Sequence, residues 1–232
     1  MKKLLSIVSV IFICAACSTR PADPTGFLGD AYRLEDGEFL QKVWHAKGVK
    51  LSDYDKVSVA PVTTDFLRYM GWWERLSPST FKEGNGVYKD FQKDANEGAA
   101  RQLAKFFEER MIEAFIEGET KTKLKYVPFT EADNKTLMVR ISIAELVPIK
   151  KVMLGLGLIG DGSLKGGSVA IEGQLRNGKT HELLAMFSDR QVNNRMLRSN
   201  EPPKLSWYSH AKPVMEAWSQ EFVNILAEKR EK

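Results

Sequence analysis

The chain has 232 residues, of which 43% are hydrophobic and 28% are charged, a composition typical of a globular protein. Its formal net charge is +4, and this value falls to +2 if Lys2 and Lys3 are removed with the N-terminal segment described next. Such a balance excludes the strongly basic surface of nucleic-acid-binding proteins, so no nucleic-acid partner is expected.

Residues 1–16 have the organisation of a secretory signal peptide. Two lysines follow Met1, residues 4–16 carry no charge, and the small residues Ala15 and Ala16 precede Cys17. A basic end, an apolar core and a small-residue cleavage site define such a signal. The apolar run is shorter than the roughly 20 residues that span a bilayer, which argues against an uncleaved membrane anchor. We therefore expect cleavage directly before Cys17.

The cleavage site is similar to the lipobox of bacterial lipoproteins. Cys14-Ala15-Ala16-Cys17 follows that motif, although Leu is preferred at the position of Cys14. The resemblance implies that the Cys17 thiol receives a diacylglycerol and that its new amine is acylated, with palmitate as a typical chain. Two or more acyl chains anchor a protein stably to a membrane. Because Ser18 rather than Asp follows, the resemblance implies the periplasmic face of the outer membrane.

Cys14 and Cys17 are the only cysteines in the chain. Because Cys14 leaves with the signal and Cys17 carries lipid, the mature chain is expected to have no disulfide and no free thiol. Residues 17–26 are predicted to form the lipidated N-terminus and a polar, proline-containing tether. Since no repeat and no second long linker follow, residues 27–232 are predicted to form a single domain.

Periodicity predicts the elements in the first half of this domain. Residues 41–46 and 56–62 are expected strands, the second of which ends at Pro61. Residues 65–86 are rich in aromatic residues, and their Gly and Pro residues argue against regular structure. Residues 87–118 place apolar side chains at helical spacing and end at Gly118, which predicts a long amphipathic helix. A further strand is expected at 124–129.

The second half is predicted to contain a hairpin and another helix. Alternating apolar and polar residues predict strands at 137–143 and 169–176. Asn177-Gly178 is expected to form a type I′ turn into a partner strand at 182–188. Residues 207–226 carry a second helical stripe, in which Pro213 either kinks the helix or marks its start. The predicted fold is α+β, with a mainly antiparallel sheet and two long amphipathic helices packed on one face.

Several short segments resemble a known family of bacterial lipoproteins. They are 25–30 (TGFLGD), 54–57 (YDKV), 60–62 (APV) and 166–172 (GGSVAIE), with Asp189-Arg190 after the hairpin. Together with the lipobox, they resemble the lipoproteins classed as domain of unknown function 3313 (DUF3313). The similarity extends over nearly the whole mature chain. It implies an envelope lipoprotein, and it implies no activity, ligand or catalytic residue.

A glycine-rich segment covers residues 155–167, and its first part (GLGLIG) has the GxGxxG spacing of a dinucleotide-binding loop. Such a loop must lie between a strand and a helix, so that phosphate meets a helix N-terminus. Here a strand follows, which argues against nucleotide binding. A flexible loop or a close-packing surface is the favoured interpretation. Contact of the apolar segment 153–159 with lipid or a partner is the alternative.

Trp72 and Trp73 leave two interpretations open. Burial in the core is favoured, because aromatic side chains bury a large apolar area. If exposed, the two rings could stack on glycan rings of peptidoglycan or contact lipid or an envelope protein. His45, His181 and His210 have no second His at ligand spacing, so neither a metal nor any other cofactor is predicted.

Two classes of function follow from these observations. The favoured hypothesis is a lipid-anchored, non-enzymatic module that binds an envelope protein or polymer, because no catalytic motif is visible in the sequence. The alternative is a periplasmic hydrolase that acts on peptidoglycan or a small molecule through paired carboxylates. Two acidic side chains converging in a deep pocket would favour the enzyme, whereas a flat patch containing Trp72 or the segment 153–160 would favour the module.

Overall fold

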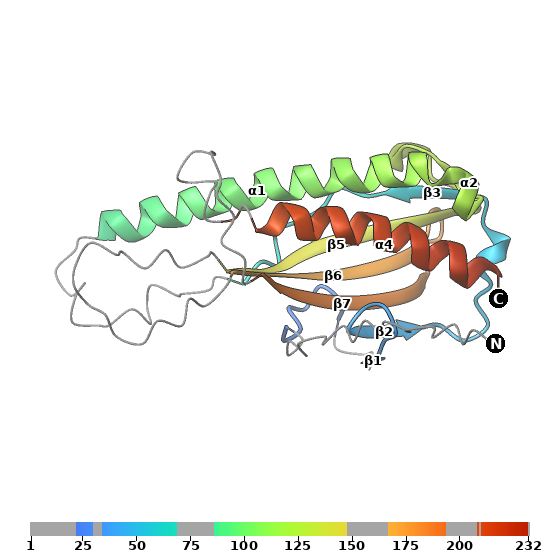
Figure 1. The fold of residues 1–232 in the computed structure, drawn as a ribbon, viewed down its shortest axis with the longest axis horizontal. Coiled ribbons are helices and arrows are strands. Elements are labelled where there is room, and N and C mark those ends of the chain that lie inside the picture. Colours follow the sequence, from blue (N-terminus) through green and yellow to red (C-terminus); the bar gives the residue numbers. More distant parts are fainter. Residues whose placement is uncertain are drawn as a thin grey trace, which may run out of the picture.

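A seven-stranded sheet forms the centre of the fold (Figure 1). The computed structural model describes residues 22–29, 34–68, 86–147, 167–193, 208 and 210–231. The strands lie side by side in the order β1-β2-β7-β6-β5-β3-β4. In chain order they are β1 (Glu35–Asp36), β2 (Lys42–His45), β3 (Lys56–Val59), β4 (Lys125–Tyr126), β5 (Thr136–Val147), β6 (Gly167–Asn177) and β7 (Leu183–Asn193).

The sheet is mixed, which corrects part of the predicted fold. Along the row β1-β2-β7-β6-β5, neighbouring strands pair antiparallel, as expected. At the other edge of the sheet, β3 pairs parallel with both β4 and β5. The reason lies in the connection, since the chain returns from β3 through a long helix before it enters β4 and β5. A helical crossover brings the next strand back in the same direction. The α+β class is confirmed.

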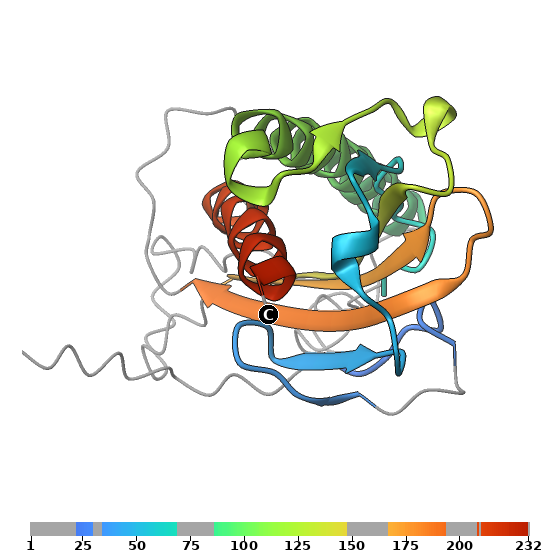
Figure 2. The same ribbon diagram turned by 90° about the vertical axis from the view of Figure 1, so that its right-hand side faces the viewer.

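Two long helices, α1 (Gly86–Glu117) and α4 (Ala211–Glu231), cover one face of the sheet side by side (Figures 1 and 2). Both were predicted. Pro213 lies in the first turn of α4, where no intrahelical N–H bond is lost, so the helix begins just before the proline instead of kinking there. A short helix α2 (Glu119–Thr122) and the 3₁₀ turns η1 (Leu51–Asp53) and η2 (Phe129–Glu131) complete the described elements.

The main core lies between this helix pair and the sheet. Apolar residues at every second position of β5 and β6 face the helices, and the apolar stripes of α1 and α4 meet them. Trp218 of α4 lies against Phe107 of α1, with ring centroids 6.0 Å apart. The largest fully buried side chains are Leu103, Phe107, Met111, Phe115, Leu124, Leu137, Met138, Ile141, Ile143, Ile171, Met186 and Met215.

The β6–β7 hairpin is confirmed, but its predicted type I′ turn is wrong. The loop has five residues, 178–182, and includes a hydrogen bond from the His181 N–H to the Asn177 carbonyl. The Asn177 side-chain carbonyl accepts the N–H groups of Lys179 and Thr180, and His181, not Gly178, has a positive φ of 58°. Asn177 therefore caps a longer turn with its side chain, a common use of Asn.

The other face of the sheet is covered in part by residues 22–29. Both oxygens of the Glu172 carboxylate accept hydrogen bonds from Thr25, at 2.7 Å from its N–H and 2.6 Å from its hydroxyl. Gln174 donates to the Phe27 carbonyl, and Leu28 packs with Met186 in a small second core. Part of the segment predicted as tether thus contacts the sheet.

Candidate functional site

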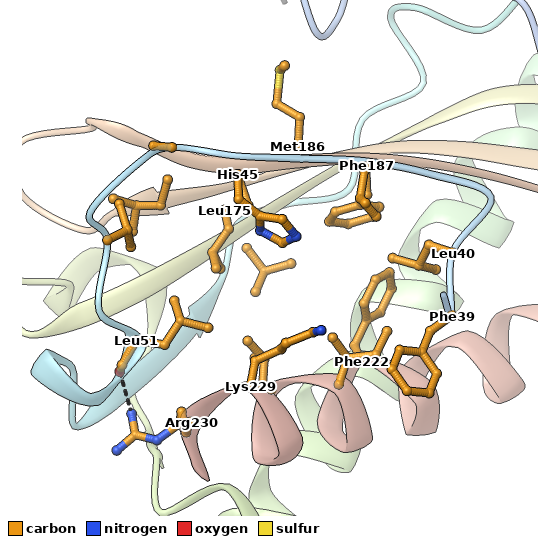
Figure 3. Close-up of a pocket in the computed structure, with 18 of the residues that line it drawn as sticks. Phe39, Leu40, His45, Leu51, Leu175, Met186, Phe187, Phe222, Lys229 and Arg230 are labelled. Carbon is orange, nitrogen blue, oxygen red and sulfur yellow. Dashed lines mark hydrogen bonds between the residues drawn. The ribbon is translucent and has the colours of Figure 1, made fainter. Parts of the chain in front are cut away.

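A hollow lies between the helix-covered face of the sheet, the end of α4, and residues 38–52, which include β2 and η1 (Figure 3). We call it the α4 pocket. Its volume is about 520 Å³, within the range typical of small-molecule sites. It is lined by Glu38, Phe39, Leu40, Val43, His45, Ala46, Val49, Lys50, Leu51, Ser52, Phe115, Val139, Leu175, Leu184, Ala185, Met186, Phe187, Phe222, Ile225, Leu226, Lys229 and Arg230.

The walls of the α4 pocket are apolar because they are a continuation of the main core. Strand alternation turns Val43 and His45 of β2 toward the helices, as it does Phe187 of β7, which pairs with Val43. The Phe187 ring meets the Phe222 ring of α4 at a centroid distance of 4.9 Å. Phe39, at the edge of the pocket beside Phe222 in Figure 3, is 41% exposed. The pocket therefore offers an apolar interior with an aromatic edge.

Residues 38–46 form one wall of the pocket, and a buried carboxylate attaches that wall to the rest of the fold. Asp189 of β7, only 2% exposed, accepts the Gln41 N–H at 3.1 Å and the Trp218 indole N–H at 2.7 Å. Gln191 donates to the same carboxylate at 2.9 Å. The Asp189 carboxylate thus joins three parts of the fold. It belongs to β7, and its donors come from α4 and from the chain that enters β2.

A second attachment holds η1 against the end of α4. The Arg230 guanidinium donates to the carbonyl of Leu51 at 2.9 Å and also to the carbonyl of Tyr54. Figure 3 shows it turned toward η1 and away from the pocket interior. Arg230 thus closes one end of the α4 pocket through backbone contacts.

Two basic side chains face the pocket interior. His45 enters from β2 and Lys229 from the last turn of α4, and both point inward in Figure 3. Partial burial, together with the positive charge of Lys229, lowers the pKa of His45 below its ordinary value of 6.5. The imidazole is therefore mostly neutral at pH 7, and it can donate or accept a hydrogen bond. Lys229 carries the positive charge.

Acidic residues do not converge in the α4 pocket. Glu38 is the only acidic residue among those that line it. A smaller hollow of about 380 Å³ on the opposite face is lined by both Asp23 and Glu172. There Glu172 is held by Thr25, and Asp23 forms an ion pair with Arg68 at 3.3 Å. Both carboxylates are engaged in holding residues 22–29 against the domain.

The described residues contain no group of three or more His, Cys, Asp or Glu side chains placed to hold a metal ion. His45 lines the α4 pocket, and His181 lies in the hairpin loop. His210 is buried, with its ring against Gly167. Within the same part of the chain, no helix has the length and apolar character needed to cross a membrane.

The structure does not describe most of the residues that the sequence singled out for binding. Cys17, Trp72, Trp73 and the glycine-rich segment up to residue 166 lie outside the described residues, so their predicted roles stay predictions. Of the described residues that the sequence analysis considered for a site, His45 is the one that lines the α4 pocket. Lys229 was missed, because a lysine in the last turn of a helix is ordinary there.

The profile of the family described as "Protein of unknown function (DUF3313)" matches residues 23–222. The chain belongs to this family. The match confirms the resemblance seen in the sequence, and it assigns no activity to this DUF3313 protein. No similar sequence is found among the curated proteins.

Among solved structures, the DUF3313 protein is similar to the PelC dodecamer from Paraburkholderia phytofirmans, with 12% identity and a TM-score of 0.39. That alignment covers 77% of this chain and 95% of the other. It is also similar to a neuraminyllactose-binding hemagglutinin homolog from Helicobacter pylori, at 10% identity and a TM-score of 0.26, covering 79% and 86% of the two chains. Neither similarity is high enough to transfer a ligand or an assembly.

Proposed function

We propose that this protein is a lipid-anchored envelope protein, held by Cys17 at the periplasmic face of the outer membrane, that binds an apolar ligand in the α4 pocket without catalysis. One observation supports the proposal most directly. The pocket is preformed, about 520 Å³ in volume, and apolar over most of its lining. Ligand sites of this kind bury most of their ligand and use a few polar groups for orientation.

The choice between binding module and hydrolase depends on the acidic residues. Acid–base hydrolysis by carboxylates requires two such groups on opposite sides of the reacting bond. The α4 pocket offers Glu38 alone, at its edge, while Asp23 and Glu172 on the opposite face serve structural contacts. The described residues therefore favour binding over hydrolysis.

Filling the pocket tests this proposal. Ala46 is half-buried in the pocket wall, and we expect Ala46→Trp to weaken binding of the neutral fluorescent probe N-phenyl-1-naphthylamine by at least about tenfold. The indole would occupy the space that the probe needs. Ala217→Trp, on the exposed side of α4, is the matched control and should leave probe affinity unchanged. The proposal would be abandoned if the wild type showed no saturable probe binding, or if both variants bound the probe with equal affinity.

The anchor places the domain close to the membrane. Asp23 forms an ion pair with Arg68 of the domain, and the six residues from Cys17 to this contact reach at most about 20 Å. We expect Cys17→Ser to move the protein from the outer-membrane fraction to the soluble periplasmic fraction, because all acyl chains are lost. Immunoblots of separated fractions measure this. A Ser18→Ala variant should stay with the outer membrane, and retention of Cys17→Ser there would contradict lipid anchoring.

A further inference from the structure

Lys229 is a cation in the apolar α4 pocket, and the described part of the chain provides no partner for it. Its side chain is half-buried, and none of the described residues forms a hydrogen bond or an ion pair with its ammonium group. Burying a charge without a partner is unfavourable, and proteins usually place an anion beside it. Among the residues that the structure describes, no anionic side chain, Glu38 of the pocket lining included, forms an ion pair with Lys229.

The position of Lys229 at the end of α4 does not by itself explain where the side chain goes. A cation in the last turn stabilises the helix through its exposed carbonyl groups. Arg230, which follows in the same turn, points toward η1 and donates to the Leu51 carbonyl. Lys229 points the other way, into the pocket between His45 and Phe222 (Figure 3). The ammonium group is thus directed at the volume that a ligand would fill.

The other charged groups around the pocket do not substitute for Lys229. Arg230 is engaged by backbone carbonyls, and Lys50 and Glu38 lie at the edge. His45 faces Lys229 from β2, and its lowered pKa leaves it mostly uncharged at pH 7. The pocket therefore presents one positive charge and, from an exposed position at the end of β2, one neutral hydrogen-bonding ring, both beside apolar side chains.

We infer that the α4 pocket binds a single-chain amphiphile with a carboxylate head group, such as a long-chain fatty acid, and this inference rests on the proposed function. The carboxylate binds the Lys229 ammonium beside His45. The hydrocarbon chain lies along Val43, Phe187 and Leu175, and each buried methylene strengthens binding by about fourfold.

A monoanionic head group fits this site better than a phosphate. Phosphate groups carry up to two negative charges and are usually bound by several donors, such as arginine forks or a helix N-terminus. With Lys50 at the edge, the ammonium directed into the pocket is that of Lys229 at the opposite, carboxyl-terminal end of α4, where the helix dipole disfavours additional negative charge. One lysine and one imidazole are sufficient for a carboxylate.

Binding of four amphiphiles that share a 12-carbon chain tests the head group. The protein is the full chain with Cys17→Ser, because its own acyl chains would compete for an apolar pocket. Calorimetric titration uses dodecanoate, dodecanol, dodecyltrimethylammonium and dodecyl phosphate below their micelle concentrations. We expect dodecanoate to bind about 10- to 100-fold tighter than dodecanol and dodecyltrimethylammonium, the range of a charge-assisted hydrogen bond, and tighter than dodecyl phosphate.

Lys229→Met keeps the alkyl length and the helix propensity while it removes the charge. This variant should lose the preference for dodecanoate and bind dodecanol as the parent does. Lys212→Met is the matched control on the same helix; its ammonium lies over the Phe106 ring, 5.5 Å from the centroid, outside the pocket lining. It should keep the full preference.

The possible results separate the two proposals. Equal affinity for dodecanoate and dodecanol in the parent protein would overturn the carboxylate assignment and leave the apolar pocket intact. Tighter binding of dodecyl phosphate than of dodecanoate would also overturn it, in favour of a phosphate head group. If no 12-carbon amphiphile binds, this inference and the proposed function both fail. An unchanged preference in Lys229→Met would remove Lys229 from the site.

Discussion

Asp189→Ala should lower the free energy of unfolding by roughly 2–4 kcal/mol, because it leaves two buried donors without an acceptor. The Trp218 indole N–H and the Gln41 backbone N–H both donate to this carboxylate, which is 2% exposed. Urea unfolding followed by tryptophan fluorescence and circular dichroism measures the change. Asp189→Asn keeps one carbonyl oxygen as acceptor, so its loss should be intermediate.

The effect of Asp189→Ala should extend to the pocket wall. Gln41 directly precedes β2, which carries Val43 and His45 of the α4 pocket. Amide hydrogen exchange of residues 41–46 should therefore become faster in the variant, and ligand affinity should fall with it. Asp65→Ala, at an exposed carboxylate, is the control and should change stability by less than about 0.5 kcal/mol. Equal effects of Asp189→Ala and Asp65→Ala would show that the buried carboxylate does not hold this wall.

Local patterns in the sequence account for most of the correctly predicted elements. The stripes of α1 and α4 repeat every three to four residues, and the long strands β5, β6 and β7 alternate apolar and polar residues. These periods record which side of each element is buried, so they can be read without knowing the partner. The turn at Asn177 was misread because its side chain, not its backbone, shapes the loop.

Pairings between distant segments were harder to predict. The parallel pairs of β3 join residues about 70 to 80 positions apart, and β3 has only four residues. A strand–helix–strand order was nevertheless visible, since a predicted long helix separates 56–62 from the strands that follow. Such an order usually yields parallel neighbours. The mixed sheet could therefore have been inferred from the order of the predicted elements.

The α4 pocket could not be predicted from the sequence, because its lining comes from β2, η1, α1, β5, β6, β7 and α4. Only the register between these elements brings His45 opposite Lys229. One weak signal existed, since strand alternation in 41–46 places His45 on the same face as Val43, an apolar residue. A histidine at a predicted core-facing position of a strand is unusual enough to note.

Gly173→Ala should destabilise the protein by roughly 1–3 kcal/mol, although alanine is normally the better residue within a strand. Gly173 of β6 pairs with Phe187 of β7, and a Cβ atom at position 173 would overlap the Phe187 ring. That ring lines the α4 pocket and packs on Phe222, so its displacement should also weaken ligand binding.

Two comparisons test whether overlap with the Phe187 ring causes the loss of stability in Gly173→Ala. Gly98 in α1 has no neighbouring atom within 4 Å of the place that a Cβ atom would take, so Gly98→Ala should stabilise the protein by up to about 1 kcal/mol through helix propensity alone. In a Phe187→Ala background, the overlap is gone, and the cost of Gly173→Ala should fall close to zero. Urea unfolding of the four proteins in this cycle measures the coupling. If Gly173→Ala costs the same with and without the Phe187 ring, close packing at this position is not what shapes the pocket wall.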